Sequence, residues 1–163
     1  MLEQLQSLAT QYPDDAAVRE QLAMGLFNTL NQAEAEDDLP RRNALLNQLQ
    51  NLAAQYPDDA AVRKALAEGL LNTLVYTKEE NDLPRRDALL EQLQSLAGRY
   101  PDDDTIREQL AKGLFNTLNQ AKAEDDLPRR KVLLSQLQSL ADQYPDDAAV
   151  REMLAMALVI VEG

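Results

Sequence analysis

The sequence predicts an all-α protein, an α-solenoid of stacked antiparallel helical hairpins with about eight helices. A Tyr-Pro-Asp-Asp segment begins at Tyr12 and recurs every 44 residues, at Tyr56, Tyr100 and Tyr144. Between these segments, apolar residues recur at steps of three or four, as they do on the buried face of a helix. Short turns that contain proline and aspartate separate the apolar stretches. A short repeat of this kind cannot bury its apolar face alone, so successive units are expected to stack.

The repeats are closely similar to one another. Residues 14–57 and 102–145 differ at ten of 44 positions. We therefore expect one repeat array over residues 1–163. Its parts are a partial first unit, 1–13, the full units 14–57, 58–101 and 102–145, and a partial terminal helix, 146–163.

The first helix of each unit, here called helix A, is most easily read in the second unit. The apolar pattern there predicts a helix from Asp58 to Asn81. Either Asp58 or Asp59 can accept hydrogen bonds from the first amides of this helix, and both carboxylates favour its positive end. The apolar positions that carry the pattern are Val62, Leu66, Leu70, Leu71 and Leu74.

The second helix of the unit, helix B, begins after a break at Asn81-Asp82-Leu83-Pro84. Proline suits a first helical turn because its missing amide costs nothing there. Helix B ends at Tyr100, because Pro101 disfavours helical geometry at the preceding residue. Helices of roughly 20 and 17 residues, joined by short turns, predict an antiparallel hairpin. A shorter helix B is expected from Met1 to about Tyr12.

One glycine recurs inside each helix A, where glycine costs about 0.5 to 1 kcal/mol relative to alanine. We interpret this recurrence as a close approach of a facing helix, and a functional hinge is the alternative. The glycines are Gly25, Gly69 and Gly113.

The spacing of apolar residues in the third unit resembles that of the tetratricopeptide repeat. The matching positions are Leu110, Ala111 and Leu114 in helix A, and Leu133, Leu137, Leu140 and Pro145 in and after helix B. Leucine replaces the small and aromatic residues of that family, and Arg107 stands at its tryptophan position. The unit is also ten residues longer than the usual 34, with the addition expected from Phe115 to Asp126. A length of 44 residues also falls in the HEAT and armadillo range of roughly 40 to 47.

The resemblance implies that the A helices line a concave groove that binds a peptide of another protein. One position of this surface varies between units, as Met24, Glu68 and Lys112. Such variation fits either tuned specificity or drift on a solvated face. We call the implied surface the helix A face, and it comprises Glu20, Met24, Phe27, Asn28, Lys64, Glu68, Leu71, Asn72, Glu108, Lys112, Phe115 and Asn116.

An asparagine stands at the same position of each full unit, as Asn28, Asn72 and Asn116. An amide side chain offers both a donor and an acceptor, so a row of asparagines can pair with an extended peptide backbone. The same side chains can instead bridge adjacent helices within the protein, and both interpretations stay open.

Two arginines open each helix B, at the end of a helix where the dipole disfavours a cation. Pairing with nearby carboxylates, such as those of Glu36-Asp37-Asp38, or with acidic residues of an adjoining helix is the explanation that we prefer, and an anion site is the alternative. The pairs are Arg41-Arg42, Arg85-Arg86 and Arg129-Arg130.

Composition excludes several classes of function. The net charge is −12, which repels the phosphate backbone of nucleic acids and attracts basic partners. The chain contains no cysteine and no histidine, so most transition-metal sites and every imidazole-dependent nucleophile are excluded. We expect no catalytic residue, no metal and no cofactor. No apolar run is long enough to cross a membrane and no signal peptide is recognisable, so we expect a cytoplasmic protein.

The last helix is more apolar than the helices that it repeats. A buried terminal helix, a piece of a longer array and a self-association surface all explain this pattern. In the third case, the carboxyl end of one molecule receives the amino-terminal helix B of another, which gives a head-to-tail homo-oligomer. The residues concerned are Met153, Met156, Val159, Ile160 and Val161.

These observations predict a non-enzymatic interaction scaffold that binds a peptide or protein segment on the helix A face. The negative charge of the chain favours a basic segment. The alternative is a structural or self-assembling repeat solenoid, natural or engineered, with no dedicated ligand. Near-identity of the units favours the alternative, whereas the variable position favours a ligand.

Overall fold

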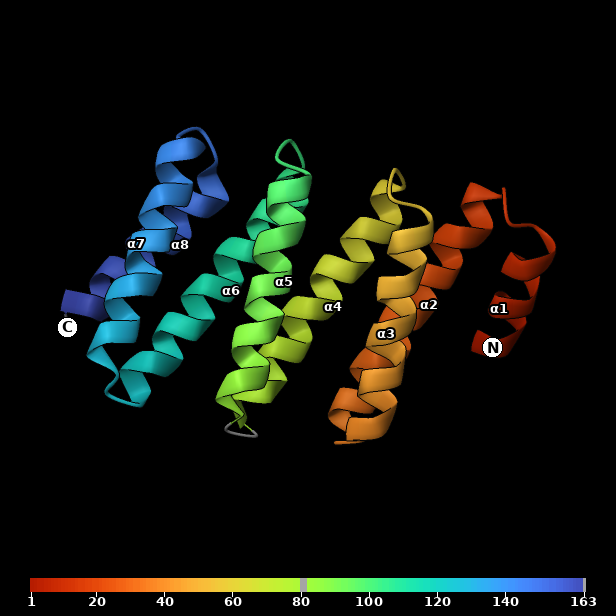
Figure 1. Ribbon diagram of the computed structural model, residues 1–163, viewed down its shortest axis with the longest axis horizontal. Coiled ribbons are helices and arrows are strands. Elements are labelled where there is room, and N and C mark those ends of the chain that lie inside the picture. Colours follow the sequence, from red (N-terminus) through yellow and green to blue (C-terminus); the bar gives the residue numbers. More distant parts are fainter. Residues whose placement is uncertain (80–81, 163) are drawn as a thin grey trace. The chain divides into compact units, whose positions relative to one another are not determined.

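The computed structural model describes residues 1–79 and 82–162, with the side chains of residues 78 and 79 left out. These residues form eight α-helices and no strand (Figure 1). Each complete helix A has 20 residues and each complete helix B has 17, as the sequence predicts. The fold is therefore all-α, of the helical solenoid class. The helices are α1 (Leu2–Gln11), α2 (Ala16–Ala35), α3 (Leu39–Gln55), α4 (Ala60–Glu79), α5 (Leu83–Arg99), α6 (Asp104–Ala123), α7 (Leu127–Gln143) and α8 (Ala148–Glu162).

Aspartate side chains start both kinds of helix. In the Tyr-Pro-Asp-Asp turns the second aspartate is the cap: Asp59 Oδ1 accepts the amides of Ala61 and Val62 at 3.1 and 3.2 Å. A different aspartate caps helix B, where Asp38 Oδ1 accepts the amide of Arg41 at 3.1 Å. Each cap satisfies amides that the helix leaves without an internal partner.

Helix A ends in a tight turn built on a left-handed residue. Asp37 has φ 55° and Asp125 has φ 56°, a conformation that aspartate adopts more readily than most residues with a side chain. The amide of Asp38 then returns to the carbonyl of Ala33 at 2.9 Å. In the second unit the predicted end of helix A at Asn81 lies outside the described residues.

Apart from the 44-residue repeats, the structure divides into two compact parts. From here on we call them unit 1, residues 1–73, and unit 2, residues 74–163. In unit 1, α2 packs against α1 and α3, and residues 60–73 of α4 belong to this unit. In unit 2, α6 contacts α5, α7 and α8, and α7 also packs on α8. Leucine and alanine dominate both cores. Fully buried examples are Leu26, Leu30 and Leu49 in unit 1, and Leu93, Ile106, Leu114, Leu118 and Leu137 in unit 2.

The recurring glycines of helix A lie where another helix comes close. A Cβ atom on Gly69 would stand 3.2 Å from Leu30 Cδ2, and one on Gly113 would stand 3.2 Å from Leu93 Cδ1. Both distances are shorter than an ordinary van der Waals contact. The close approach that the sequence predicts is therefore confirmed, and it explains why glycine is kept inside a helix.

Candidate functional site

Each unit contains a junction where one helical hairpin meets the next, and an arginine of helix A is its centre. In unit 1, Arg19 Nε donates to Asp59 Oδ2 at 3.1 Å. The same guanidinium donates to the carbonyl of Pro13 at 3.1 Å and lies 4.3 Å from the centre of the Tyr56 ring. The Tyr56 hydroxyl in turn donates to the Pro13 carbonyl at 3.0 Å.

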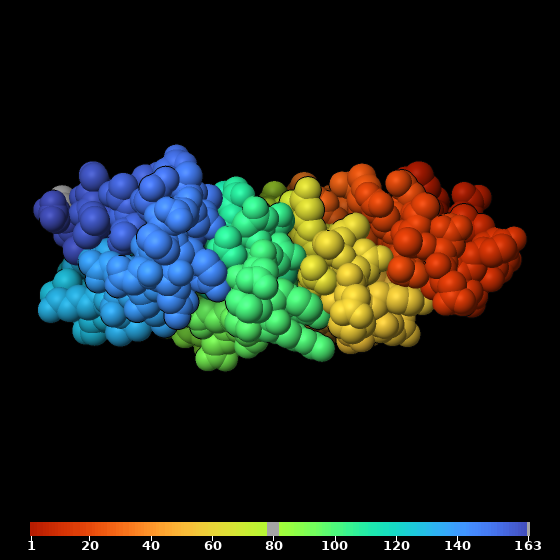
Figure 2. Space-filling view, turned by 90° about the horizontal axis from the view of Figure 1, so that it is seen from above, coloured from red at the N-terminus to blue at the C-terminus, as the bar shows by residue number. Residues whose placement is uncertain are grey.

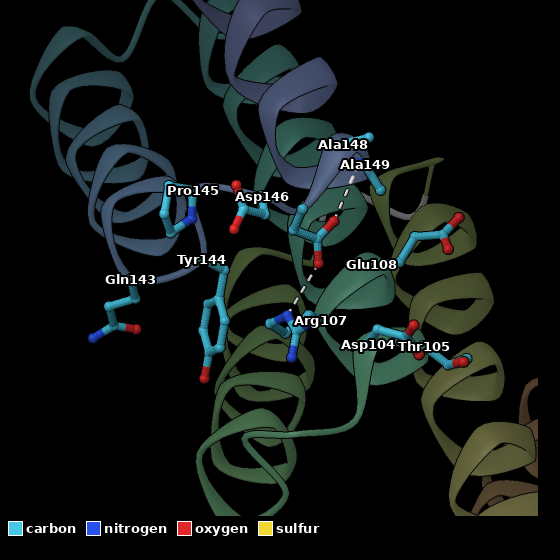
Figure 3. A pocket seen from close by; sticks show the side chains of 11 residues that line it. Asp104, Thr105, Arg107, Glu108, Gln143, Tyr144, Pro145, Asp146, Ala148 and Ala149 are labelled. Carbon is cyan, nitrogen blue, oxygen red and sulfur yellow. Dashed lines mark hydrogen bonds and ion pairs between the residues drawn. The ribbon is translucent and has the colours of Figure 1, made fainter.

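The same arrangement recurs in unit 2 around Arg107 (Figure 3). Arg107 Nε donates to Asp147 Oδ2 at 3.0 Å, and the guanidinium donates to the Pro101 carbonyl at 2.7 Å. Its centre lies 4.1 Å from the centroid of the Tyr144 ring. The side chains of Arg107 and Asp147 are only 12% and 11% exposed. A charge pair with so little solvent contact resists screening, so it can hold the two hairpins together.

The aspartate of each junction has two structural roles. Asp147 Oδ1 accepts the amides of Ala149 and Val150, which starts α8, while its second oxygen binds Arg107. Asp59 divides its oxygens in the same way between the start of α4 and Arg19. One carboxylate therefore fixes both the beginning of a helix and its position against the preceding hairpin.

Glutamine side chains connect successive B helices. Gln6 donates to Gln48 at 2.5 Å in unit 1, and Gln94 donates to Gln136 at 3.3 Å in unit 2. Because the two pairs are separated by two repeats, they are the same contact made twice.

Arginines of these pairs bind carboxylates in both units, so pairing, which we preferred to an anion site, is confirmed for Arg41, Arg42, Arg86, Arg129 and Arg130. Arg41 lies 3.2 Å from Glu36, and Arg42, whose side chain is almost fully buried, lies 3.8 Å from Asp37. In unit 2, Arg130 lies 3.6 Å from Asp125.

Two pairs of unit 2 join residues of successive repeats. Arg86 donates to Glu124 at 2.9 Å, and Arg129 donates to Asp87. Hydrogen bonds from Gln120 and from Arg86 lower the pKa of Glu124, because both stabilise its ionised form. Pairing with acidic residues of an adjoining helix, which the sequence allowed beside local pairing, is therefore confirmed for Arg86 and Arg129.

The helix A face is mostly accessible in both units. Glu20, Met24, Asn28 and Lys64 are exposed. Half-buried positions follow at Phe27, Glu68, Asn72, Glu108, Lys112, Phe115 and Asn116.

Leu71 is an exception, because only 8% of its surface is exposed. Leu70 and Leu74 on the same helix are also buried, so the buried stripe of α4 is wide enough to include position 71. The expectation that Leu71 contacts a peptide is therefore wrong for this conformation of the chain. A leucine at this position packs in the core, whereas Phe27 and Phe115 stay partly exposed.

Several polar groups of the helix A face already have partners. Asn72 Nδ2 donates to Asn31 Oδ1 at 2.9 Å, which is the internal bridge between A helices. Lys112 lies 2.7 Å from Glu108, and Lys64 lies 3.9 Å from Glu68. Exposed pairs one helical turn apart are weak, about 0.3 to 0.5 kcal/mol, and a ligand can displace them.

A recess of about 640 Å³ adjoins the junction of unit 2 and reaches the helix A face at Glu108 (Figure 3). Its walls come from the start of α6, the end of α7 and the start of α8. The carboxylates of Asp104, Glu108 and Asp146 line it together with the Arg107–Asp147 pair. The recess is therefore acidic, and its single arginine is already bound to a carboxylate.

The apolar residues predicted for self-association differ in exposure along α8. Met156 and Val159 are exposed, and 73% of the surface of Val159 is open. Met153, Ile160 and Val161 are half-buried.

The sequence interpretation missed the arginine junctions and the burial of the charged side chains. Arg19, Arg63 and Arg107 each stand seven residues after the Tyr of a Tyr-Pro-Asp-Asp turn, so the signal was present in the repeat. We assigned those aspartates to helix capping alone, and nothing in a single unit marks which arginine reaches the next turn. The burial of Arg42 and Arg86 had no local signal at all.

Over the described residues, no group of His, Cys, Asp or Glu is placed to hold a metal ion. None of the helices in those residues has the length and apolarity needed to span a membrane. Comparison with protein-family models, curated proteins and solved structures finds no match.

Proposed function

We propose that this chain is a non-enzymatic interaction scaffold of tetratricopeptide-like architecture, and that the helix A face of unit 2 binds an extended segment of another protein. The observation that carries the proposal is the row of accessible side chains on α6, where Glu108, Lys112, Phe115 and Asn116 stand one helical turn or less apart. A half-exposed aromatic ring beside an amide is a combination that anchors peptide ligands.

The charge of this surface favours a basic partner. Glu108 belongs both to the helix A face and to the acidic recess, so a lysine or arginine of the partner can reach the carboxylates of Asp104 and Asp146. The net charge of −12 attracts such a segment at long range. Phe115 and Asn116 then supply the apolar and hydrogen-bonding contacts.

The competing function is a structural solenoid with no dedicated ligand. The Asn72–Asn31 bridge favours it, because an asparagine that joins two A helices is not available to a peptide. One repeat later, Val75 stands at the position of Asn31 and its side chain cannot accept a hydrogen bond, so we base the binding proposal on Asn116.

The test is selection from a random peptide library against the purified chain, followed by calorimetric titration of the selected peptides. We expect basic sequences whose dissociation constant rises about tenfold or more in the variant F115A/N116A, since two anchoring side chains are lost. V132A is the matched control, because Val132 is an exposed apolar residue of helix B. Equal binding by F115A/N116A and the unmodified chain, or selection of acidic peptides only, would contradict the proposal.

A further inference from the structure

The two ends of the array carry the two halves of a junction that the protein already makes internally. In the internal junctions, one hairpin contributes an arginine, a proline carbonyl and a glutamine, as Arg107, Pro101 and Gln94 do in unit 2. The next hairpin contributes the tyrosine and aspartate of its turn, Tyr144 and Asp147. We infer that a second copy of this chain docks head to tail and repeats this junction between molecules.

The first half of the set recurs at the carboxyl end of unit 2. Arg151 is the repeat counterpart of Arg19 and Arg107, and it is exposed where both of those are half-buried. Ala155 is exposed, whereas its counterparts Ala23 and Ala111 are fully buried. Figure 2 shows the dark-blue residues of α8 at the surface of unit 2. We call this surface the C-terminal face, and it comprises Gln138, Pro145, Arg151 and Ala155.

The second half recurs at the amino end of unit 1. Tyr12 and Asp15 are exposed, whereas Tyr56 and Asp59, one repeat later, are half-buried in the internal junction. Leu8 is 41% exposed, and its counterpart Leu52 is 8% exposed. We call this surface the N-terminal face, and it comprises Gln4, Leu8, Tyr12 and Asp15.

The repeat register assigns the contacts between copies without further assumption. Arg151 stands three repeats after Arg19, and Asp15 and Tyr12 stand one repeat before Asp59 and Tyr56. If a second copy continues the repeat, the unit 1 junction is therefore reproduced with Arg151 on Asp15 of the next copy, beneath the ring of Tyr12. By the same correspondence, the Tyr12 hydroxyl donates to the Pro145 carbonyl of the other copy, and Gln138 donates to Gln4. In these three pairings a donor on one face meets an acceptor on the other, which is the complementarity that a specific interface requires.

The contacts that this register assigns between copies are a few polar pairs and one ring contact, all at exposed positions. We expect a reversible association that grows with concentration. Because the two faces differ, the contact is heterologous. Successive copies then form either a closed ring or an open filament.

The test uses one variant for each face. R151E places a carboxylate opposite Asp15, and D15N keeps a good helix cap while it turns a donor toward Arg151. Light scattering and sedimentation equilibrium over a hundredfold range of concentration at ~0.15 M salt give the mass of each protein. We expect the unmodified chain to exceed twice the monomer mass, and each variant to show a dissociation constant at least about tenfold higher. Circular dichroism checks that both variants keep their helix content.

Mixing the two variants tests the head-to-tail arrangement itself. In an equimolar mixture, Arg151 of D15N can still bind Asp15 of R151E, so one intact contact forms and heterodimers appear whose mass does not grow further with concentration. K122E is the control for the change of charge, because Lys122 is exposed and belongs to neither face; it should associate like the unmodified chain. A monomeric mass for the unmodified chain at all concentrations overturns the inference. So does association of R151E and D15N at unmodified strength, or a mixture that stays monomeric.

Discussion

Replacing Arg107 with alanine should destabilise unit 2 far more than the same change at Arg151, although the two residues occupy equivalent positions in the repeat. Arg107 donates to Asp147 at 3.0 Å, donates to the Pro101 carbonyl at 2.7 Å and lies over the ring of Tyr144. Arg151 is exposed, so its loss removes little.

The expected size of the effect follows from these contacts. A hydrogen bond between charged groups contributes about 1.5 to 3 kcal/mol, a hydrogen bond to a carbonyl about 0.5 to 1.5 kcal/mol, and the ring contact about 0.5 to 1 kcal/mol. Ordering the arginine side chain offsets up to about 2 kcal/mol of this sum. With the full offset, we expect R107A to lower the free energy of unfolding by about 0.5 to 3.5 kcal/mol, and R151A by less than about 0.5 kcal/mol.

The assay is urea unfolding followed by circular dichroism, at a protein concentration low enough to keep both variants monomeric. The slope of the transition must be compared as well as its midpoint, because repeat arrays need not unfold in one step. A loss below 0.5 kcal/mol for R107A, or equal losses for the two variants, would refute the view that the arginine junction stabilises neighbouring hairpins.

Two further predictions concern a backbone contact and a titrating group. G113A should destabilise the protein by about 1 to 3 kcal/mol, because its Cβ would stand 3.2 Å from Leu93 Cδ1. G98A should stabilise the protein by roughly 0.5 kcal/mol, because a Cβ there would meet no neighbouring side chain within 4 Å. A thermal melt in which both variants shift the melting temperature in the same direction would contradict this pair of predictions. The Glu124 carboxylate should stabilise the fold at pH values above its ordinary pKa of 4.5, and this contribution should disappear as the pH falls through its lower folded-state pKa. The difference in the free energy of unfolding between the unmodified chain and E124Q should therefore shrink on acidification below pH 4.5. A difference that grows there would contradict the assignment.

Much of the fold follows from local features of the sequence. The apolar spacing, the capping aspartates and the prolines act within one helical turn, so the lengths and starts of the helices can be predicted from a single repeat. The glycine of helix A also reports a close contact, because nothing else justifies its cost.

The candidate site is less predictable, because its properties depend on neighbours in other repeats. Leu71 and Phe115 share one repeat position, yet only the leucine is buried. Asn72 reaches Asn31 across 41 residues, and sequence spacing alone left both that bridge and a peptide ladder open.

By itself, the sequence determined the helical repeat, its register and the places where each helix starts and stops, because these depend on hydrogen bonds and apolar periodicity within a few residues. Only the tertiary structure decided that Asp59 and Asp147 each bind an arginine of the preceding hairpin, and that the guanidinium of Arg42 is buried. Such pairings are made between residues about one repeat apart, and their strength comes from the exclusion of water, which exists only once the hairpins have stacked.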